Sequence, residues 1–378
     1  MVRFLISFRT ILACPKGKVM AKIDAFFTLM NEQGASDLHL VAGQVPLIRL
    51  HGDLERVKYN VLDNDELKKM LYEIAPEPKI KVFEESGDVD FGYEIAGVAR
   101  YRANFFNQKY GIGAAFRQIP NKIATARDLG LPAILTRASM LHKGLVLVTG
   151  PTGSGKSTTL AAMLDHANKH RKDHIITLED PIEFVHQSQG CVVNHREIGT
   201  HTKSFAAGLR GALREDPDII LVGEMRDLET ISLALEAAAT GHLVFATLHT
   251  TSAAKTVDRV IEVFPHDQQN QVRNTLSTSL KLVVAQNLFK RIDMKGRCCA
   301  LEVMVCNAAI QNLIRENKTF QIPSIIQVGK KYGMQTLDDA IMEVLQKKWI
   351  SPEEAYDKCM DKPKFAPFLK SPPDDLTG

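Results

Sequence analysis

The sequence contains no pair of cysteines with the spacing C-x-x-C. Its six cysteines lie at positions 14, 191, 298, 299, 306 and 359, so neither a cysteine zinc site nor a disulfide framework is expected. Free thiols fit a reducing cytoplasm. No apolar run reaches the roughly 18 residues that a membrane span needs. The formal net charge is only +3 and the basic residues form no block, so charge gives little support for a nucleic-acid partner.

What is present is the composition of a globular protein. The chain has 378 residues, of which 45% are hydrophobic and 24% are charged, and this length is more typical of two domains than of one. Near its start, Ile23, Phe26, Phe27 and Met30 follow the spacing of an amphipathic helix, which Gly34 can end. Short alternating segments then predict strands, with a helical stretch near 64–74. We therefore predict an α+β domain over residues 20–118.

The pattern changes after a segment, 119–131, that is bounded by prolines and predicts a linker. The apolar runs GLVLVTG, HIITLED, DIILVGE and HLVFATLH then alternate with helical stretches, as in a parallel sheet that is buried on both faces. We predict an α/β domain over residues 132–360 that becomes helical after about residue 300. Four prolines in the last 18 residues predict a disordered tail over 361–378.

The stretch GPTGSGKS at 150–157 matches the phosphate-binding pattern G-x-x-x-x-G-K-[ST]. It directly follows the strand LVLVT and precedes a helical stretch, which is the context that the pattern requires. Its glycines let backbone N–H groups turn towards phosphates, Lys156 supplies a positive charge to the β and γ groups, and Ser157 can ligate Mg²⁺. The expected ATP-binding residues are Gly150, Pro151, Thr152, Gly153, Ser154, Gly155, Lys156, Ser157 and Thr158.

Acidic residues follow two of the predicted strands. Gly223 occupies the place where many P-loop enzymes carry a magnesium-associated aspartate, and Glu224 comes next; Glu179 and Asp180 end another strand. Carboxyl ends of parallel strands meet at one edge, so these acids are expected beside the phosphates. One would help Ser157 to hold Mg²⁺ and the other would orient or deprotonate the attacking water, with either assignment of Glu179 and Glu224 open. Glu183 is expected on a solvated or interface surface.

His249 ends the strand HLVFATL, about 90 residues after the phosphate motif. A histidine at a strand end is often a structural residue. Here it is the fourth polar group to end a strand beside the same expected site. We therefore interpret His249 as a sensor that hydrogen-bonds the γ-phosphate and reports its loss to the helix that begins near Ser252.

The first 19 residues superficially resemble a signal sequence, but Arg9 interrupts their apolar run. An exported enzyme would have no access to cytoplasmic ATP. We therefore expect residues 1–19 to be a non-native or disordered extension, with Met20 as the natural start.

The four motifs together, GPTGSGKS, ITLEDPIEF, IILVGEMRD and ATLHTTSA, resemble those of the secretion-superfamily ATPases that drive type II secretion and type IV pili. The resemblance extends over nearly the whole chain from Met20. It implies a PAS-like N-terminal domain linked to a RecA-like P-loop domain, assembled as a hexameric ring. It also implies that Arg102 and Arg117 of the N-terminal domain reach the nucleotide, where they would neutralise charge that develops on the γ-phosphate.

Two features favour the retraction ATPases within this superfamily. The tetracysteine zinc element of the assembly and secretion ATPases is absent, and AIQNLIRE at 309–316 closely matches the retraction signature, with Gln311 in place of an arginine. Ile310, Leu313 and Ile314 would form one face of a short helix. We expect a partner to bind this face, although an ordinary amphipathic helix would show the same pattern.

The resemblance implies a cytoplasmic motor ATPase, at the inner face of the inner membrane, that powers type IV pilus retraction and twitching motility. Its expected partners are the other subunits of a homohexamer, the inner-membrane platform protein of the pilus machine and an accessory retraction ATPase. We expect neither nucleic-acid binding nor membrane insertion. The alternatives are that this chain is itself the accessory ATPase, or that it belongs to a DNA-translocating ring.

Overall fold

The structure is a computed structural model that describes residues 21–50, 53–95, 98–119 and 122–371. The chain divides into two compact units, Met1–Lys122 and Ile123–Gly378, each with its own hydrophobic core. This division falls inside the segment 119–131 that the sequence predicts as a linker. The extension predicted for residues 1–19 lies outside the described residues.

The first unit opens with helix α1 (Asp24–Gln33). Phe26, Phe27 and Met30 on one face of this helix are buried. Gly34 ends the helix with a φ of 65°, in the left-handed region that a side chain with a Cβ rarely adopts. The predicted amphipathic helix and its end are therefore confirmed.

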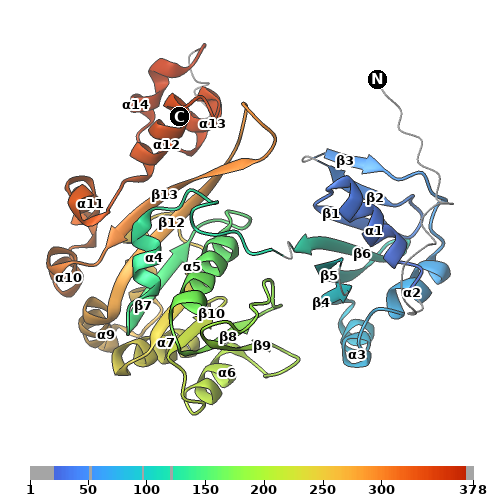
Figure 1. The fold of residues 1–378 in the computed structure, drawn as a ribbon, viewed down its shortest axis with the longest axis horizontal. Coiled ribbons are helices and arrows are strands. Elements are labelled where there is room, and N and C mark those ends of the chain that lie inside the picture. Colours follow the sequence, from blue (N-terminus) through green and yellow to red (C-terminus); the bar gives the residue numbers. More distant parts are fainter. Residues whose placement is uncertain (1–20, 51–52, 96–97, 120–121, 372–378) are drawn as a thin grey trace. The chain divides into compact units, whose positions relative to one another are not determined.

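An antiparallel sheet with the strand order β3-β2-β1-β6-β5-β4 forms the rest of the first unit, together with two further helices (Figure 1). Its strands are β1 (Asp37–Val41), β2 (Leu47–Leu50), β3 (Asp53–Arg56), β4 (Asp88–Ile95), β5 (Ala99–Gln108) and β6 (Gly111–Ile119). Helix α2 (Asn64–Tyr72) confirms the predicted helical stretch, whereas the sequence analysis missed α3 (Glu77–Ser86). Tyr101, Ala103 and Phe105 of β5 alternate into the core.

The second unit is built on a sheet with the strand order β13-β12-β7-β11-β10-β8-β9. Its strands are β7 (Gly144–Thr149), β8 (His174–Glu179), β9 (Val192–Glu197), β10 (Ile219–Val222), β11 (Leu243–Leu248), β12 (Leu280–Lys290) and β13 (Arg297–Val305). Across the sheet, each pair of neighbouring strands from β12 to β9 is parallel. Only the edge strand β13 is antiparallel to its neighbour, β12. The four predicted apolar strands are confirmed as β7, β8, β10 and β11. The sequence analysis missed β9, β12 and β13.

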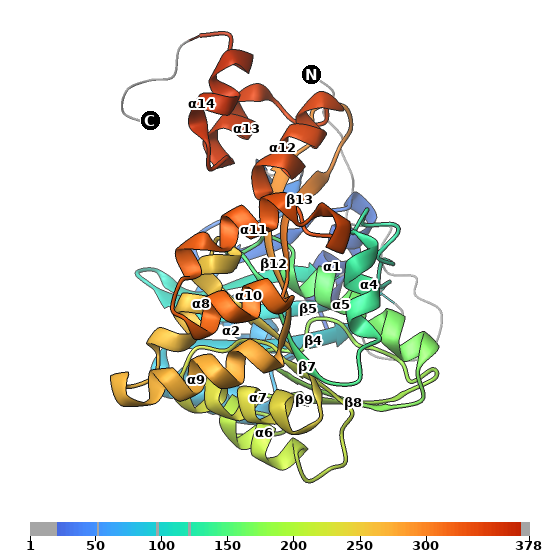
Figure 2. The same cartoon turned by 90° about the vertical axis from the view of Figure 1, so that its left-hand side faces the viewer.

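Helices cover both faces of this sheet (Figure 2). One face packs against α4 (Ala133–Ser139) and α5 (Lys156–His170). The other face packs against α6 (Phe205–Ala212), α7 (Leu228–Thr240), α8 (Ala253–Glu262), α9 (His266–Ser279), α10 (Ala308–Arg315) and α11 (Ile322–Val328). Among the helices that the structure describes, none combines the length and the apolar character needed to cross a membrane. An N-terminal strand-rich unit ahead of a doubly covered parallel sheet confirms the predicted α/β fold class.

The C-terminal helices have a core of their own, and this core corrects one prediction. It contains α12 (Leu337–Gln346), α13 (Pro352–Lys358) and α14 (Lys362–Phe365). These helices pack against the end of β12 and the start of β13. The sequence predicts disorder from residue 361, but Phe365 is fully buried in this core and anchors the segment. The prolines do not prevent helix formation because Pro363 stands in the first turn of α14, where its missing N–H has no intrahelical partner. Residues 372–378 lie outside the described residues.

Helix α10 carries the AIQNLIRE segment, and its apolar face is part of the main core. Ile310 and Ile314 are fully buried in the core on the face of the sheet that α9 and α11 cover. Leu313 is partly buried and packs against the same core. The expectation that a partner binds this face is therefore wrong for Ile310 and Ile314. The exposed positions of the helix include Asn312 and Arg315.

Ile314→Ala should therefore lower the free energy of unfolding by about 2–5 kcal/mol, the usual cost of removing a fully buried aliphatic side chain. Asn312→Ala on the exposed face of α10 should change it by no more than about 0.5 kcal/mol. Urea unfolding monitored by circular dichroism measures both. Equal midpoints for Ile314→Ala and the unmodified protein would show that this side chain is not part of the core.

Candidate nucleotide-binding site

The candidate site lies at one edge of the second sheet because four parallel strands end there. Strands β7, β8, β10 and β11 run in the same direction, and the register pairs Thr149 at the end of β7 with Leu248 at the end of β11. The phosphate-binding loop follows β7 and His249 follows β11. Glu179 ends β8, and Glu224 stands two residues beyond the end of β10. The sheet thus brings together the groups that the sequence analysis expected at the phosphates.

The phosphate-binding loop requires its glycines for both conformation and space. Gly150, Gly153 and Gly155 have φ values of 141°, 76° and 89°, all in the region that favours glycine. A Cβ at Gly150 would lie 2.3 Å from the carbonyl oxygen of Gln286. Helix α5 begins immediately after the loop, at Lys156, so its first N–H groups face the position that a phosphate group occupies in such loops.

Gln286 on β12 braces this loop, and the sequence analysis missed it. Its Nε2 donates a hydrogen bond to the carbonyl oxygen of Ser154 at 2.7 Å, and its Oε1 accepts one from the Thr159 hydroxyl at 2.7 Å. Gln286 is 3% exposed. This buried amide bonds an acceptor on the loop and a donor on α5, and it therefore fixes the position of the loop relative to the helix. An isolated glutamine in an unpredicted strand carries no sequence signal of this role.

Lys156 folds back over the loop. Its Nζ donates to the carbonyl oxygens of Gly150 at 2.9 Å and Pro151 at 3.1 Å. Burial lowers the pKa of Lys156, while the negative charges of Glu224 and Glu183 oppose that shift. Glu183 is half-buried and its charge acts on the ammonium group, while its expected place on a solvated or interface surface stays a prediction.

Glu224 and His249 are in direct contact. His249 Nε2 lies 2.7 Å from Glu224 Oε1, and Arg226 Nε lies 2.6 Å from the same oxygen. Partial burial by itself raises the pKa of Glu224, but the hydrogen bonds and charges of Arg226 and His249 outweigh it and lower the pKa overall. Glu224 is consequently held as a carboxylate, a state that can accept a proton or bind a cation.

A hollow of about 390 Å³ opens beside this pair. Besides Glu224 and His249 it is lined by Met225, Arg226, Leu248, Thr250 and Arg259. The sequence analysis did not select Arg226 or Arg259. Arg226 stands beside the recognised acid in the motif GEMRD, which could have drawn attention to it, whereas Arg259 lies on α8 without any local motif.

Hydroxyl groups connect the segment after His249 to the strand that precedes the phosphate loop. Thr250 Oγ1 lies 2.7 Å from Thr256 Oγ1, which in turn lies 3.5 Å from Thr149 Oγ1. Thr149 immediately precedes Gly150 of the loop. Helix α8, which contains Thr256, is capped by the Ser252 side chain, so the predicted start of a helix near Ser252 is confirmed. A displacement of the His249 segment would therefore reach both α8 and the base of the loop.

Glu179 lies at the carboxyl end of β8 and is 9% exposed. Its Oε2 accepts a hydrogen bond from the Glu183 N–H at 3.4 Å, and its Oε1 lies 3.8 Å from His195 Nδ1. His195 belongs to the unpredicted strand β9. Glu179 is thus a nearly buried carboxylate at the same sheet edge as the phosphate loop, and one of its oxygens accepts a backbone N–H.

The donor set is compatible with Mg²⁺. Ser157 provides a hydroxyl in the first turn of α5, and Glu179 and Glu224 provide carboxylates at neighbouring strand ends. Mg²⁺ prefers such oxygen ligands and usually keeps several waters and phosphate oxygens in its shell. Within the described ranges, no group of three or more His, Cys, Asp and Glu side chains could enclose a metal without such help.

Arg102 and Arg117 lie in the first unit, directly opposite each other on β5 and β6. Arg102 pairs with Asp90 at 3.5 Å and Arg117 with Asp37 at 2.9 Å. Their side chains are 40% and 65% exposed. The structure brings these two arginines together on one sheet face, and their role at the nucleotide stays a prediction.

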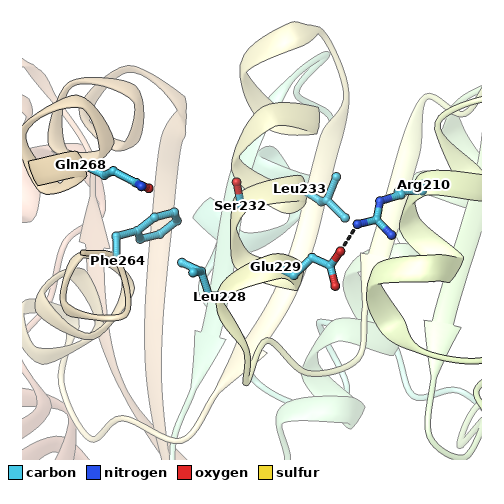
Figure 3. A pocket seen from close by; sticks show the side chains of 7 residues that line it. All are labelled: Arg210, Leu228, Glu229, Ser232, Leu233, Phe264 and Gln268. Atoms are coloured by element: carbon cyan, nitrogen blue, oxygen red, sulfur yellow. Dashed lines mark ion pairs between the residues drawn. The ribbon is translucent and has the colours of Figure 1, made fainter.

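A second hollow, of about 430 Å³, lies among α6, α7 and the start of α9 (Figure 3). Figure 3 shows Phe264 and Leu228 facing this hollow and an ion pair between Arg210 and Glu229. These helices cover the sheet face opposite α5. None of the residues that line this hollow belongs to the phosphate-binding motifs, so we do not assign the nucleotide to it.

A doubly covered parallel sheet with a phosphate-binding loop, two carboxylates and a histidine at its carboxyl edge defines a P-loop ATPase. Residues 131–295 match the family model described as type II/IV secretion system protein. The type IV pilus retraction ATPase PilT of Pseudomonas aeruginosa is 55% identical over 327 residues, 86% of this chain and 95% of that protein. The chain therefore belongs to the family of PilT-type ATPases among the type II/IV secretion system proteins.

Two further similarities agree with this assignment. A twitching motility protein of Neisseria gonorrhoeae is 49% identical over 315 residues, 83% of this chain and 84% of that protein. The crystal structure of the pilus retraction motor PilT with bound ADP aligns with a TM-score of 0.83 and 43% identity, and covers 92% of this chain and 99% of that one.

Gln286→Leu should weaken the binding of ADP about tenfold or more. The substitution leaves the Ser154 carbonyl oxygen and the Thr159 hydroxyl without their buried partner, and each loss costs about 1–3 kcal/mol, part of which would appear as disorder of the loop. Titration with a fluorescent ADP analogue measures the affinity. Asn287→Leu is the matched control, because the next residue of β12 faces the other side of the sheet. Unchanged affinity in Gln286→Leu would show that the brace is dispensable.

Proposed function

We propose that this ATPase powers the retraction of type IV pili and thereby twitching motility. The observation that carries the proposal is similarity to a named retraction ATPase over 86% of the chain, including every phosphate-site motif. The geometry supports it, because the loop, Glu179, Glu224 and His249 leave the sheet at one edge.

In the proposed reaction, the loop N–H groups and Lys156 bind the β- and γ-phosphates of ATP. To do so, Lys156 exchanges its contacts with the loop carbonyls for contacts with phosphate oxygens. Ser157 and one of the two glutamates, Glu179 or Glu224, would hold Mg²⁺ directly or through water, and the ion would neutralise negative charge on the phosphates. Whichever glutamate does not serve the ion orients or deprotonates the attacking water; both assignments remain compatible with the geometry.

His249 and Arg226 give this site a way to respond to the γ-phosphate. Both contact one oxygen of Glu224. A γ-phosphate offers a competing acceptor for either group, and a donor that turns to the phosphate leaves the Glu224 oxygen available to water. Loss of the phosphate returns the donor to Glu224. Thr250 and Thr256 would pass this displacement to α8. His249 thus acts as the proposed sensor.

We further propose that the protein is a cytoplasmic homohexamer at the inner face of the inner membrane. Its motion would act on the inner-membrane platform protein of the pilus machine, and an accessory retraction ATPase is a further candidate partner. In this assembly Arg102 and Arg117 would release Asp90 and Asp37 and contribute their guanidinium groups to a nucleotide. The low net charge, +3, gives no support to a DNA-translocating ring.

Glu224→Gln should slow ATP hydrolysis by about a hundredfold while ATP still binds, because the amide cannot take up a proton or balance the charge of a cation. In a strain that lacks every retraction ATPase, the unmodified protein should restore twitching and this variant should leave pili extended. Colourimetric phosphate release and twitching zones measure the two effects.

Glu229→Gln is the matched control, since Glu229 pairs with Arg210 away from the phosphate motifs. Normal turnover in Glu224→Gln would remove Glu224 from the site. If the unmodified protein hydrolyses ATP but restores twitching only beside a second retraction ATPase, the accessory role replaces the main one.

Arg117→Ala should abolish most turnover if the arginine serves the nucleotide of another subunit. Mixing it with Lys156→Ala then creates some interfaces that combine an intact arginine with an intact loop. Phosphate release by the mixture should rise above that of either variant alone and pass through a maximum with the mixing ratio. A mixture that never exceeds its parents would contradict action between subunits.

A further inference from the structure

The turn that follows β10 carries Glu224, and the neighbouring strand β11 extends alongside this turn. β10 ends at Val222, which pairs with Ala246, whereas β11 continues through Thr247 to Leu248. Thr247 is the only polar residue of β11, and it is 6% exposed. A buried hydroxyl needs a hydrogen-bond partner, so the contacts of Thr247 show what this residue does in the strand.

Thr247 bonds both of the peptide groups that flank Glu224. Its Oγ1 donates to the carbonyl oxygen of Gly223 at 2.5 Å. Its own carbonyl oxygen accepts the N–H of Met225 at 3.1 Å. The Gly223 carbonyl belongs to the peptide group before the Cα of Glu224, and the Met225 N–H belongs to the peptide group after it. Because each peptide group is planar, holding both of them fixes the direction in which the Glu224 side chain leaves the backbone.

Strand β8 holds the same turn from the other side. The Gly223 N–H donates to the carbonyl oxygen of Leu178 at 2.7 Å. A Cβ at Gly223 would lie 3.0 Å from that oxygen and 3.3 Å from the Cα of Glu179. Both distances are shorter than the roughly 3.5 Å at which non-bonded atoms pack comfortably. A side chain at Gly223 would therefore press on the backbone of β8, which is a physical reason for the acid of this motif to stand one residue later, at Glu224.

The end of β11 also supplies a partner for the Glu224 carboxylate. His249 stands two residues after Thr247, and its Nε2 lies 2.7 Å from Glu224 Oε1. Arg226 contacts the same oxygen, but its side chain is 77% exposed and is therefore less firmly held. β11 pairs with β7 over all six of its residues, and β7 leads directly into the phosphate loop. The backbone and the carboxylate of Glu224 are thus both tied to the strand that lies beside that loop.

We propose that Thr247 is a positioning residue for Glu224: its hydroxyl and its carbonyl oxygen hold the two peptide groups that flank Glu224, and β11 thereby presents this carboxylate to His249 and to the nucleotide. This inference rests on the proposed role of Glu224 in ATP hydrolysis. Because the Thr247 hydroxyl is buried and already donates to Gly223, it acts through Glu224 and not on the nucleotide. A displacement of a catalytic group by about 1 Å can cost on the order of a hundredfold in rate.

Two substitutions separate the hydroxyl of Thr247 from the rest of its side chain. Thr247→Val removes the hydroxyl and keeps the branched shape, whereas Thr247→Ser keeps the hydroxyl and removes the methyl group. Both leave the backbone bond to Met225 in place. We expect Thr247→Val to lower kcat for ATP about 10–100-fold and to change KM less than about twofold, because the groups that bind the phosphates are untouched. Thr247→Ser should recover most of the lost kcat.

Ser277→Ala is the matched control. Ser277 of α9 is fully buried, and its hydroxyl also donates to a backbone carbonyl, that of Asn274 at 2.8 Å, but it lies outside the phosphate motifs. This variant should keep its full kcat. The thermal midpoint of each variant, measured in parallel, separates loss of fold from loss of positioning. The proposal is overturned if Thr247→Val and Thr247→Ser lose kcat equally, or if kcat falls only in proportion to the folded fraction.

A double-variant cycle with Glu224→Gln tests the route of the effect. If Thr247 acts through Glu224, adding Thr247→Val to Glu224→Gln should lower kcat by less than about twofold further. Independent, multiplying effects would overturn the proposal and leave the role of Glu224 intact. Normal turnover in Glu224→Gln alone would instead overturn the proposed role of Glu224, and with it the inference.

Discussion

The site depends on the hydrogen-bond register of the parallel strands in the second unit. Thr149, Leu248 and Ala285 stand at the same level of β7, β11 and β12, so the phosphate loop and His249 leave the sheet at the level of Gln286, which lies within β12. Between these residues the chain makes long excursions through helices on both faces. Parallel pairing is what converts large separations along the sequence into neighbouring positions at one edge. A change of register by one residue would turn every one of these side chains to the opposite face.

A second constraint is that the charged groups of the site already have partners in the protein. Lys156 binds loop carbonyls, Glu224 binds His249 and Arg226, and Glu179 accepts the backbone N–H of Glu183. A triphosphate must therefore compete for these contacts, and each exchange moves a side chain. Partial burial makes an unpartnered charge costly, so the groups rearrange as sets. This property suits an enzyme in which the presence or absence of one phosphate has to be converted into movement.

The errors of the sequence analysis have identifiable physical causes. The apolar face of α10 has the same spacing whether it packs on a sheet or binds a partner, and only the contacts of Ile310 and Ile314 show that it is core. Proline content predicted a disordered tail, but a single buried aromatic residue, Phe365, anchors a short helix there. Strands β9 and β12 escaped notice because polar residues interrupt their apolar pattern, and one of those polar residues, Gln286, is the one that braces the phosphate loop.

The sequence by itself determined the phosphate loop, the four buried strands and the acids and histidine that follow them. Each of these is a local pattern: glycines at positions of unusual φ, apolar runs of strand length, and a polar residue at the end of each run. Only the tertiary structure decided which distant residues support them. Gln286 acts through contacts that join β12 to the phosphate loop and to α5, and such contacts leave no local pattern because they depend on register and on the packing of side chains across the sheet.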